Sequence, residues 1–203
     1  MIIGQDGFPM REMPSPENPT GDVMIGDPTP DFLLGIRNNM AYKNFALTFL
    51  WDIRVGGDVA NVTTNWTRAQ GIDASTMDRG SQVIFRGVLE DGNVNNIPVI
   101  IDDVNYYNNT RGNRDIAERF IEDGSWVRLR DVTLSYSVPN NIVNKMKMRN
   151  LNIGIYGRNL LLFTAYRGVD PETNLGGPNT SMGVDAFGTP NTRSVGLNIT
   201  AGF

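Results

Sequence analysis

The chain has 203 residues and a formal net charge of −4, from 18 Lys and Arg against 22 Asp and Glu. It contains no Cys and no His, which excludes thiol nucleophiles, disulfides, Ser-His-Asp triads and imidazole metal sites. The charges are spread along the chain without a basic block, so the composition argues against nucleic-acid binding. The 23 Asn, 22 Gly and 11 Pro residues are typical of short strands joined by polar loops.

The first segment, residues 1–30, is predicted to be a loop or linker. It holds six Pro residues among Gly and Asp, and each Pro removes a backbone donor that a strand or helix would use. The chain has no apolar run long enough for a transmembrane helix, and its first residues lack the basic and apolar regions of a signal peptide.

Five segments alternate between apolar and polar residues and are predicted as β-strands: 32–40, 43–55, 125–138, 150–163 and 194–203. The clearest one places six apolar residues on one face, namely Phe45, Leu47, Phe49, Trp51, Ile53 and Val55. The alternation is less regular over residues 125–131, which predicts a β-bulge there.

Two long segments interrupt this pattern. Residues 56–124 show no sustained period, although residues 58–70 could form a helix capped by Asp58, and residues 82–89 could pair with residues 97–101 in a hairpin. A connection of this length is either functional or an inserted subdomain. Residues 164–190 form the second long loop.

The five strands are long enough to cross a bilayer when tilted. Short turns join 32–40 to 43–55 and 125–138 to 150–163, whereas the other connections are long, which is the asymmetry of outer-membrane barrels. The fold class expected is therefore all-β, an antiparallel transmembrane β-barrel segment with long extracellular loops. Five strands cannot close a barrel, so the rest of the wall must come from outside this chain. The alternative is a soluble β-sandwich, in which the apolar faces would pack on each other.

Several motifs in the same order and spacing resemble the late barrel of the SusC/RagA-type TonB-dependent outer-membrane transporters. The resemblance covers about residues 21–203 and rests on residues 25–32, 42–47, 56–57, 125–136, 157–160, 168–172 and 190–203. It implies a barrel of about 22 strands around a plug, of which residues 31–203 would supply the C-terminal part. It also implies localisation in the outer membrane and import of oligosaccharides or peptides with a SusD-like surface lipoprotein as lid. The TonB system would act through an N-terminal part that this chain lacks.

The resemblance further implies that Phe203, an aromatic residue ending an alternating strand, is the recognition signal for the barrel-assembly machinery. The alternative for Phe203 is a lipid-facing aromatic residue without that role. Four aromatic residues of the long loops are candidates for stacking on a glycan or for contact with a peptide substrate or the lid: Trp66, Tyr106, Tyr107 and Phe187. Packing of the loops against one another is the alternative for these rings.

Polar residues of the strands and loops complete the candidates. Arg54, Arg128, Arg130 and Arg158 are expected on the lumen face, where they would pair with Asp52 or Asp131 or line the passage. Residues 170–172 are interpreted as loop architecture. Residues 91–102 loosely follow a calcium-loop pattern but favour a plain hairpin turn, so no metal site and no cofactor is predicted.

Three classes of function remain open: a segment of a nutrient importer, a cell-surface binding or adhesion module without transport, and a soluble β-domain with an unknown ligand. An enzyme is not expected, because no constellation of carboxylate, Lys, Ser or Tyr residues indicates a catalytic site. The sequence does not identify the substrate.

Overall fold

The computed structural model describes residues 1–11, 14–102, 106–107, 116–175 and 182–203. The chain divides into two compact units. We call residues 28–57, 123–173 and 189–203 the sheet unit, and residues 1–27, 58–122 and 174–188 the loop unit. The loop unit thus combines the start of the chain with most of the two long segments between strands. Each unit is described separately.

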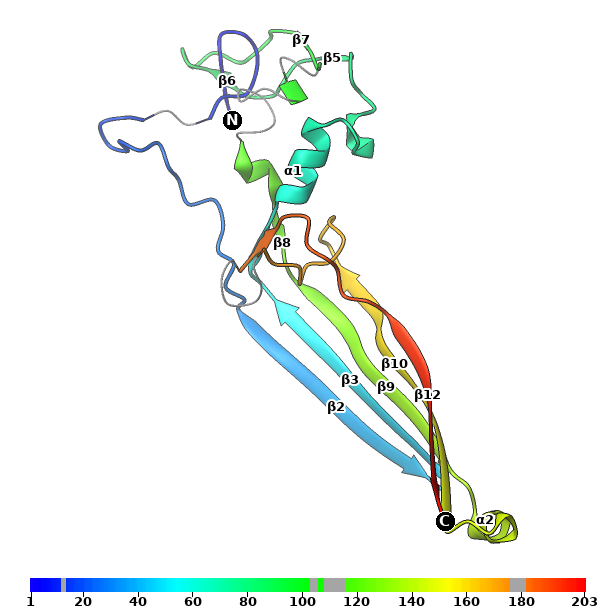
Figure 1. Cartoon of the computed structure of the whole chain (residues 1–203). Helices are drawn as coiled ribbons and strands as arrows, with labels where there is room; N and C mark the ends of the chain where they lie inside the picture. Colours follow the sequence, from blue (N-terminus) through cyan, green and yellow to red (C-terminus); the bar gives the residue numbers. More distant parts are fainter. Residues whose placement is uncertain (12–13, 103–105, 108–115, 176–181) are drawn as a thin grey trace. The chain divides into compact units, whose positions relative to one another are not determined.

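The sheet unit is built on one five-stranded antiparallel sheet with the order β12-β10-β9-β3-β2 (Figure 1). Its strands are β2 (Phe32–Tyr42), β3 (Phe45–Val55), β9 (Trp126–Ser137), β10 (Asn150–Thr164) and β12 (Ser194–Gly202). These bounds agree closely with the five predicted strands. The alternation of apolar and polar residues was therefore sufficient to locate every long strand.

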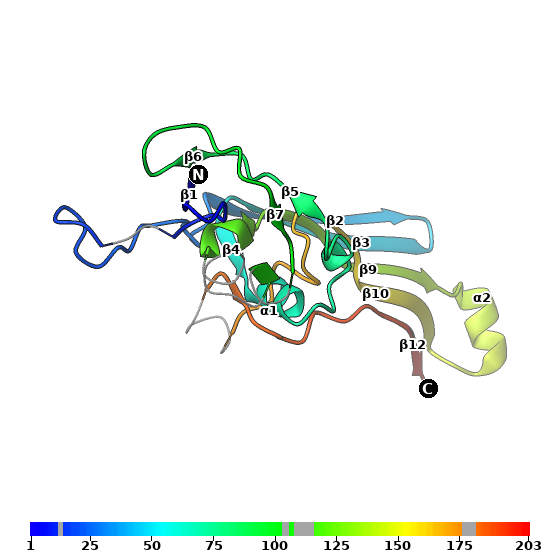
Figure 2. The same ribbon diagram turned by 90° about the horizontal axis from the view of Figure 1, so that it is seen from above.

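Short connections lie together at one end of this sheet, which we call the turn end. A tight turn joins β2 to β3, with Lys43 in the left-handed conformation at φ 54°. The β9–β10 connection contains α2 (Asn140–Val143) and the 3-10 turn η4 (Asn144–Met146). Figure 2 shows α2 where β9 and β10 meet. The chain terminus lies at the same end, since Arg149 N–H donates to Gly202 O at 2.7 Å.

Strand register places most of the apolar residues of the five strands on one face of the sheet. Phe45 pairs with both Tyr42 and Tyr136, and Ile153 pairs with both Tyr136 and Ile199. Residues paired in an antiparallel sheet share a face, so a continuous apolar surface runs from β2 to β12. We call it the apolar face, and the opposite one the polar face.

A β-bulge in β9 preserves this separation of faces. Asp131 pairs with Leu50 and Leu129 with Trp51, so Arg130 is left as the extra residue. The register of β10 shifts at the same level, between Arg158 and Leu161. The predicted bulge is confirmed, and it explains why the alternation in β9 changes phase without moving Leu129 off the apolar face.

The loop unit contains short elements. Two sheets have two strands each, β1 (Ile2–Ile3) with β6 (Val88–Leu89) and β5 (Gln82–Val83) with β7 (Val99–Ile100). A third has the order β11 (Val184–Asp185), β4 (Asp58–Asn61) and β8 (Ile121–Asp123). The helical elements are α1 (Val62–Ala69) and the 3-10 turns η1 (Ala74–Thr76) and η3 (Ala117–Phe120).

Three details of this unit differ from the sequence prediction. The helix starts at Val62 and is capped by Asn61, whose side chain accepts from Thr64 N–H at 2.9 Å. Asp58 cannot cap it, because Asp58 lies in β4 and its carboxylate accepts from Asp27 N–H at 2.9 Å. The pairing of residues 82–83 with 99–100 is as predicted, whereas Val88 and Leu89 pair with β1.

Near the start of the chain, Ile2 and Ile3 form β1, and Ile3 is fully buried. Among the described residues, no helix has the length and hydropathy that a membrane-spanning helix requires.

Candidate functional site

The polar face carries a charged cluster in which Arg130 of β9 is central. Its Nε and Nη2 donate to Asp52 Oδ2 of β3 at 3.0 and 2.6 Å. Its Nη1 and Nη2 also donate to the two carboxylate oxygens of Glu172, at 3.0 and 2.7 Å. The planar guanidinium therefore joins two strands to the segment after β10 through paired, charge-assisted bonds.

A second ion pair, Arg128 with Asp170, lies beside the first and is almost fully buried. Arg128 Nη2 donates to Asp170 Oδ1 at 2.7 Å, and the two side chains are 2% and 3% exposed. Arg128 Nε lies 3.1 Å from Glu172 Oε2, which is an ion-pair distance but not an aligned hydrogen bond. We call Asp52, Arg128, Arg130, Asp170 and Glu172 the arginine cluster.

The local sequence explains why two arginines reach the same carboxylates. The bulge at Arg130 directs its side chain to the polar face, where Arg128 already lies. Trp126 lies under both, with its ring centre 5.6 Å from the Arg128 guanidinium carbon and 5.3 Å from that of Arg130. This stacking supports both cations, of which Arg128 is almost fully buried and Arg130 partly exposed.

The carboxylates of the cluster also order the backbone around them. Asp170 Oδ1 accepts from Glu172 N–H at 3.0 Å, and Asp170 Oδ2 accepts from Asn191 N–H at 3.1 Å. Asn191 in turn donates from its side chain to Glu172 Oε2 at 3.0 Å. The cluster therefore attaches residues 170–172 and the approach to β12 to the polar face.

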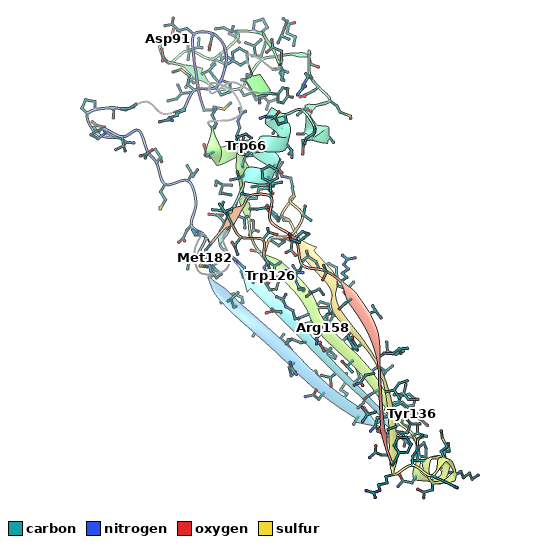
Figure 3. The ribbon with its side chains drawn as sticks, viewed as in Figure 1. Trp66, Asp91, Trp126, Tyr136, Arg158 and Met182 are labelled. Carbon is teal, nitrogen blue, oxygen red and sulfur yellow. The ribbon has the colours of Figure 1, made fainter. Side chains whose placement is uncertain are left out.

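The other predicted arginines are also on or beside this face. Arg158 Nε lies 3.7 Å from Asp131 Oδ2 in an exposed pair, and Arg54 donates from Nη2 to Pro28 O at 2.8 Å. The expected partnerships with Asp52 and Asp131 are confirmed, for Arg130 and Arg158 respectively. The sequence did not indicate Asp170 and Glu172 as the partners of Arg128, because nothing in the pattern places a distant loop beside β9. Figure 3 shows Trp126 and Tyr136 at opposite ends of β9, with Arg158 in between.

The apolar face has aromatic residues near both ends. Phe45 and Tyr136 pack with ring centres 4.7 Å apart at the turn end, beside Tyr42. Trp51 and Phe163, with ring centres 6.5 Å apart, lie toward the other end. Aromatic girdles at the two interfaces are typical of membrane barrels.

The dimensions of the strands fit the same interpretation. β3 has 11 residues, and at about 3.3 Å per residue and a tilt of about 40° it rises about 28 Å. The apolar band of an outer-membrane barrel is about 25 Å tall.

Two of the four loop aromatics are exposed. Trp66 on α1 is 40% exposed and Phe187 is 64% exposed. Phe187 is also held in the left-handed conformation at φ 58°, where its N–H donates to Thr63 Oγ1 at 2.7 Å. A bulky residue is uncommon in this conformation, so the contacts around it fix an exposed ring at this position.

The other two, Tyr106 and Tyr107, are buried in the core of the loop unit. Tyr107 is completely buried, and both rings pack with Ile101 and against Phe8, Val83 and Phe85. Burial, with a hydrogen bond from the Tyr107 hydroxyl to Asp78, raises the pKa of Tyr107 to about 12. These two rings hold the loop unit together in this structure, which matches the packing alternative and leaves Trp66 and Phe187 as the candidates for external contacts.

Phe203 follows the last residue of β12 at the turn end and is 78% exposed. In the alternation of β12, position 203 belongs to the same series as Val195, Leu197 and Ile199, which lie on the apolar face.

We propose that Phe203 acts as an assembly signal, as the sequence resemblance implies. Deletion of Phe203 from the full-length protein is then expected to lower its level in the outer membrane several-fold. Immunoblots of membrane fractions measure this level, and Phe203→Trp, which retains an aromatic end, serves as the control. Equal levels of the deletion variant and the parent would refute the role assigned to Phe203.

Comparisons with known proteins fit these features. No protein-family model matches the chain. TonB-dependent receptor P3 of Formosa agariphila is 32% identical over 193 residues, covering 87% of this chain and 17% of the relative. TonB-dependent receptor SusC of Bacteroides thetaiotaomicron is 22% identical over 191 residues, again 17% of its length. The solved RagAB peptide importer in its open-open state aligns with a TM-score of 0.60 at 20% identity, over 86% of this chain and 17% of that chain.

A single antiparallel sheet with an apolar outer face, a charged inner face and aromatic residues near both ends is part of the wall of a membrane β-barrel. By sequence and fold, the chain is homologous to part of the SusC/RagA-type TonB-dependent receptors, which confirms the resemblance found in the sequence. It spans 17% of the length of these relatives. The relatives are named as receptors and not as enzymes.

Proposed function

We propose that this chain is the C-terminal part of the barrel of a TonB-dependent outer-membrane importer of oligosaccharides or peptides. In this proposal the sheet unit is barrel wall, the loop unit lies on the extracellular side, and a SusD-like surface lipoprotein covers the entrance. TonB acts through a part of the protein outside this chain, and no residue of the chain catalyses a reaction.

The exposed apolar face is the observation that carries this proposal. Its side chains are open across all five strands, including Phe32, Ile36, Phe45, Ile155, Leu161, Leu197 and Ile199. Apolar surface of this extent is stable only against another apolar phase. In a soluble β-sandwich a second sheet would cover it, and within the described part of the sheet unit there is only one sheet.

The names of the relatives favour import over adhesion. SusC is named as a TonB-dependent receptor and RagAB as a peptide importer. The charged cluster on the inner wall also suits a lumen that solutes cross. The exposed loop aromatics Trp66 and Phe187 would contact the substrate or the lid.

A growth experiment separates import from adhesion. The gene for the full-length protein is deleted, and the host is grown on a panel of oligosaccharides and peptides as sole nutrient. We expect growth on one substrate class to be lost and to return with the intact gene, but not with a variant uncoupled from TonB. Unchanged growth on the whole panel, with the protein present in the outer membrane, would favour the adhesion module.

Replacement of Phe187 tests the loop aromatics. We expect Phe187→Ala to weaken binding of the imported substrate or of the lid about tenfold while changing stability little, because the ring is exposed and buries little area in this chain. Titration of the purified full-length protein measures this binding. Ile72→Ala removes a side chain that is 76% exposed in the same unit and is the matched control. Equal binding by both variants and the parent would remove Phe187 from the contact surface.

A further inference from the structure

The charges of the chain are segregated in the fold although they look evenly spread in the sequence. No Asp or Glu occurs in residues 32–51, 132–169 or 186–203. All three lysines of the chain, Lys43, Lys145 and Lys147, fall within these stretches, as does Arg149. The register and connections of the sheet bring these four cations together at the turn end.

These four side chains are all exposed. The ion pairs formed among the described residues involve none of them. Lys43 lies with Nζ 5.3 Å from the centre of the Tyr42 ring, which is itself 72% exposed. The charged side chains of the turn end are therefore all basic, on a chain whose net charge is −4.

Apolar side chains project from the same surface. Ile142 and Met146 in the β9–β10 connection are about half exposed, and Phe203 is 78% exposed. Buried Val143 anchors this connection to the sheet unit. Cations next to exposed apolar and aromatic groups form the pattern that a membrane interface selects, since the apolar groups enter the acyl boundary while the amines remain among the headgroups.

The position of this surface selects lipid over a soluble acidic partner. The aromatic residues Tyr42, Phe45 and Tyr136 mark the boundary of the apolar face, and the four cations lie just beyond that boundary. In a barrel wall this level coincides with the headgroups of the leaflet on the short-turn side.

We propose that the turn end of the sheet binds the headgroups of anionic phospholipids through Lys43, Lys145, Lys147 and Arg149. The proposal rests on the membrane-barrel interpretation above. Each basic residue near an anionic surface raises local binding about fivefold at low ionic strength, and salt weakens the effect. The four cations together therefore favour phosphatidylglycerol or cardiolipin over zwitterionic lipids.

The test uses the full-length protein reconstituted in vesicles, with a fluorophore on a single cysteine introduced by Asn144→Cys. The chain itself contains no Cys, so this region carries one label only. Headgroup spin-labelled phosphatidylglycerol or phosphatidylcholine is added at equal mole fraction, and quenching of the fluorophore is compared. We expect phosphatidylglycerol to quench at least about threefold more strongly, and the difference to shrink in high salt.

Charge removal completes the test. The Lys145→Gln/Lys147→Gln variant removes two of the four cations and should lower the quenching ratio markedly, whereas Arg167→Gln/Arg193→Gln, which removes the same charge from the far end of the sheet, should leave the ratio unchanged. Equal quenching by both lipids in the parent protein would overturn the proposal, as would a preference that Lys145→Gln/Lys147→Gln leaves undiminished. If the surface serves an acidic protein instead, lipid selectivity will be absent while a poly-Glu peptide binds in a salt-sensitive way, and the lipid assignment is then wrong.

Resistance of the same protein to extraction from the vesicles by carbonate is measured in parallel. A protein that inserts but shows no lipid selectivity contradicts the headgroup site alone. A protein that fails to insert contradicts the membrane-barrel interpretation on which the site rests.

Discussion

Replacing Arg128 with Met is expected to release residues 166–173 from the polar face, at a cost of about 3–5 kcal/mol. The substitution leaves the carboxylate of Asp170, which is 3% exposed, buried without its cation. It also removes one of the two cations that stack on Trp126. The ion pair between Arg128 and Asp170 is almost fully buried. Its loss therefore costs the free energy of an uncompensated buried charge, which is larger than the contribution of an ordinary surface ion pair.

Trypsin provides the measurement. Arg167 is exposed and lies in the released segment, so cleavage after Arg167 in the folded full-length protein reports how often the segment opens. An opening free energy lowered by about 3 kcal/mol raises the cleavage rate more than about 100-fold. Adding Asp170→Asn should restore part of the protection, because the buried charge is then gone while one side-chain oxygen remains to accept from the N–H of Glu172 or of Asn191.

Arg158→Met is the matched control on the same face. Its ion pair with Asp131 is long, at 3.7 Å, and Arg158 is 67% exposed, so its loss should cost less than about 1 kcal/mol. Equal cleavage rates in Arg128→Met and Arg158→Met would show that the arginine cluster does not hold the loop.

Placing an arginine at Leu197 is expected to destabilise the assembled protein by about 2–4 kcal/mol. Leu197 lies in the middle of β12, pairs with Ile155 and points from the apolar face. A guanidinium there would have to enter hydrocarbon near the bilayer midplane, where the cost is largest. Heat-modifiable mobility of the outer-membrane fraction measures the folded population, and urea unfolding in vesicles measures the free energy.

The neighbouring residue gives the control. Asn198 pairs with Gly154 on the polar face, so Asn198→Arg should assemble as the parent does. Full assembly of Leu197→Arg would mean that the apolar face is not in contact with lipid.

The strands of the sheet were predictable from sequence because a membrane barrel imposes one requirement on every strand, an apolar residue at every second position. That requirement is local, so the bounds of β3 or β12 can be read from a single segment. The bulge at Arg130 was also visible, since it breaks the alternation in one place.

The arginine cluster was only partly predictable. Asp52 and Arg130 lie on adjacent strands, and the break in alternation near residue 130 was visible in the sequence, so their pairing could be anticipated. Asp170 and Glu172 approach β9 through a loop, and loop conformation depends on contacts distant in sequence. The start of α1 was misplaced for a similar reason. The carboxylate of Asp58 accepts a hydrogen bond from the backbone N–H of Asp27, and no helical sequence pattern reveals this contact.

The basic turn end was missed for a different reason. Most short segments of the sequence contain both acidic and basic residues. The three lysines come to one end only through the pairing of β2 with β3 and of β9 with β10. The signal that could have found it is the absence of Asp and Glu from residues 132–169, which is a property of the sequence alone.

Single spin labels placed in turn on residues 195–200 of the full-length protein in vesicles test the membrane assignment most directly. Collision with oxygen, which concentrates in lipid, and with a water-soluble nickel chelate should alternate with a period of two: oxygen dominates at Val195, Leu197 and Ile199, and nickel at Gly196, Asn198 and Thr200. Dominance of the nickel chelate at all six positions, or protection of the odd positions from both reagents, would contradict a lipid-facing wall.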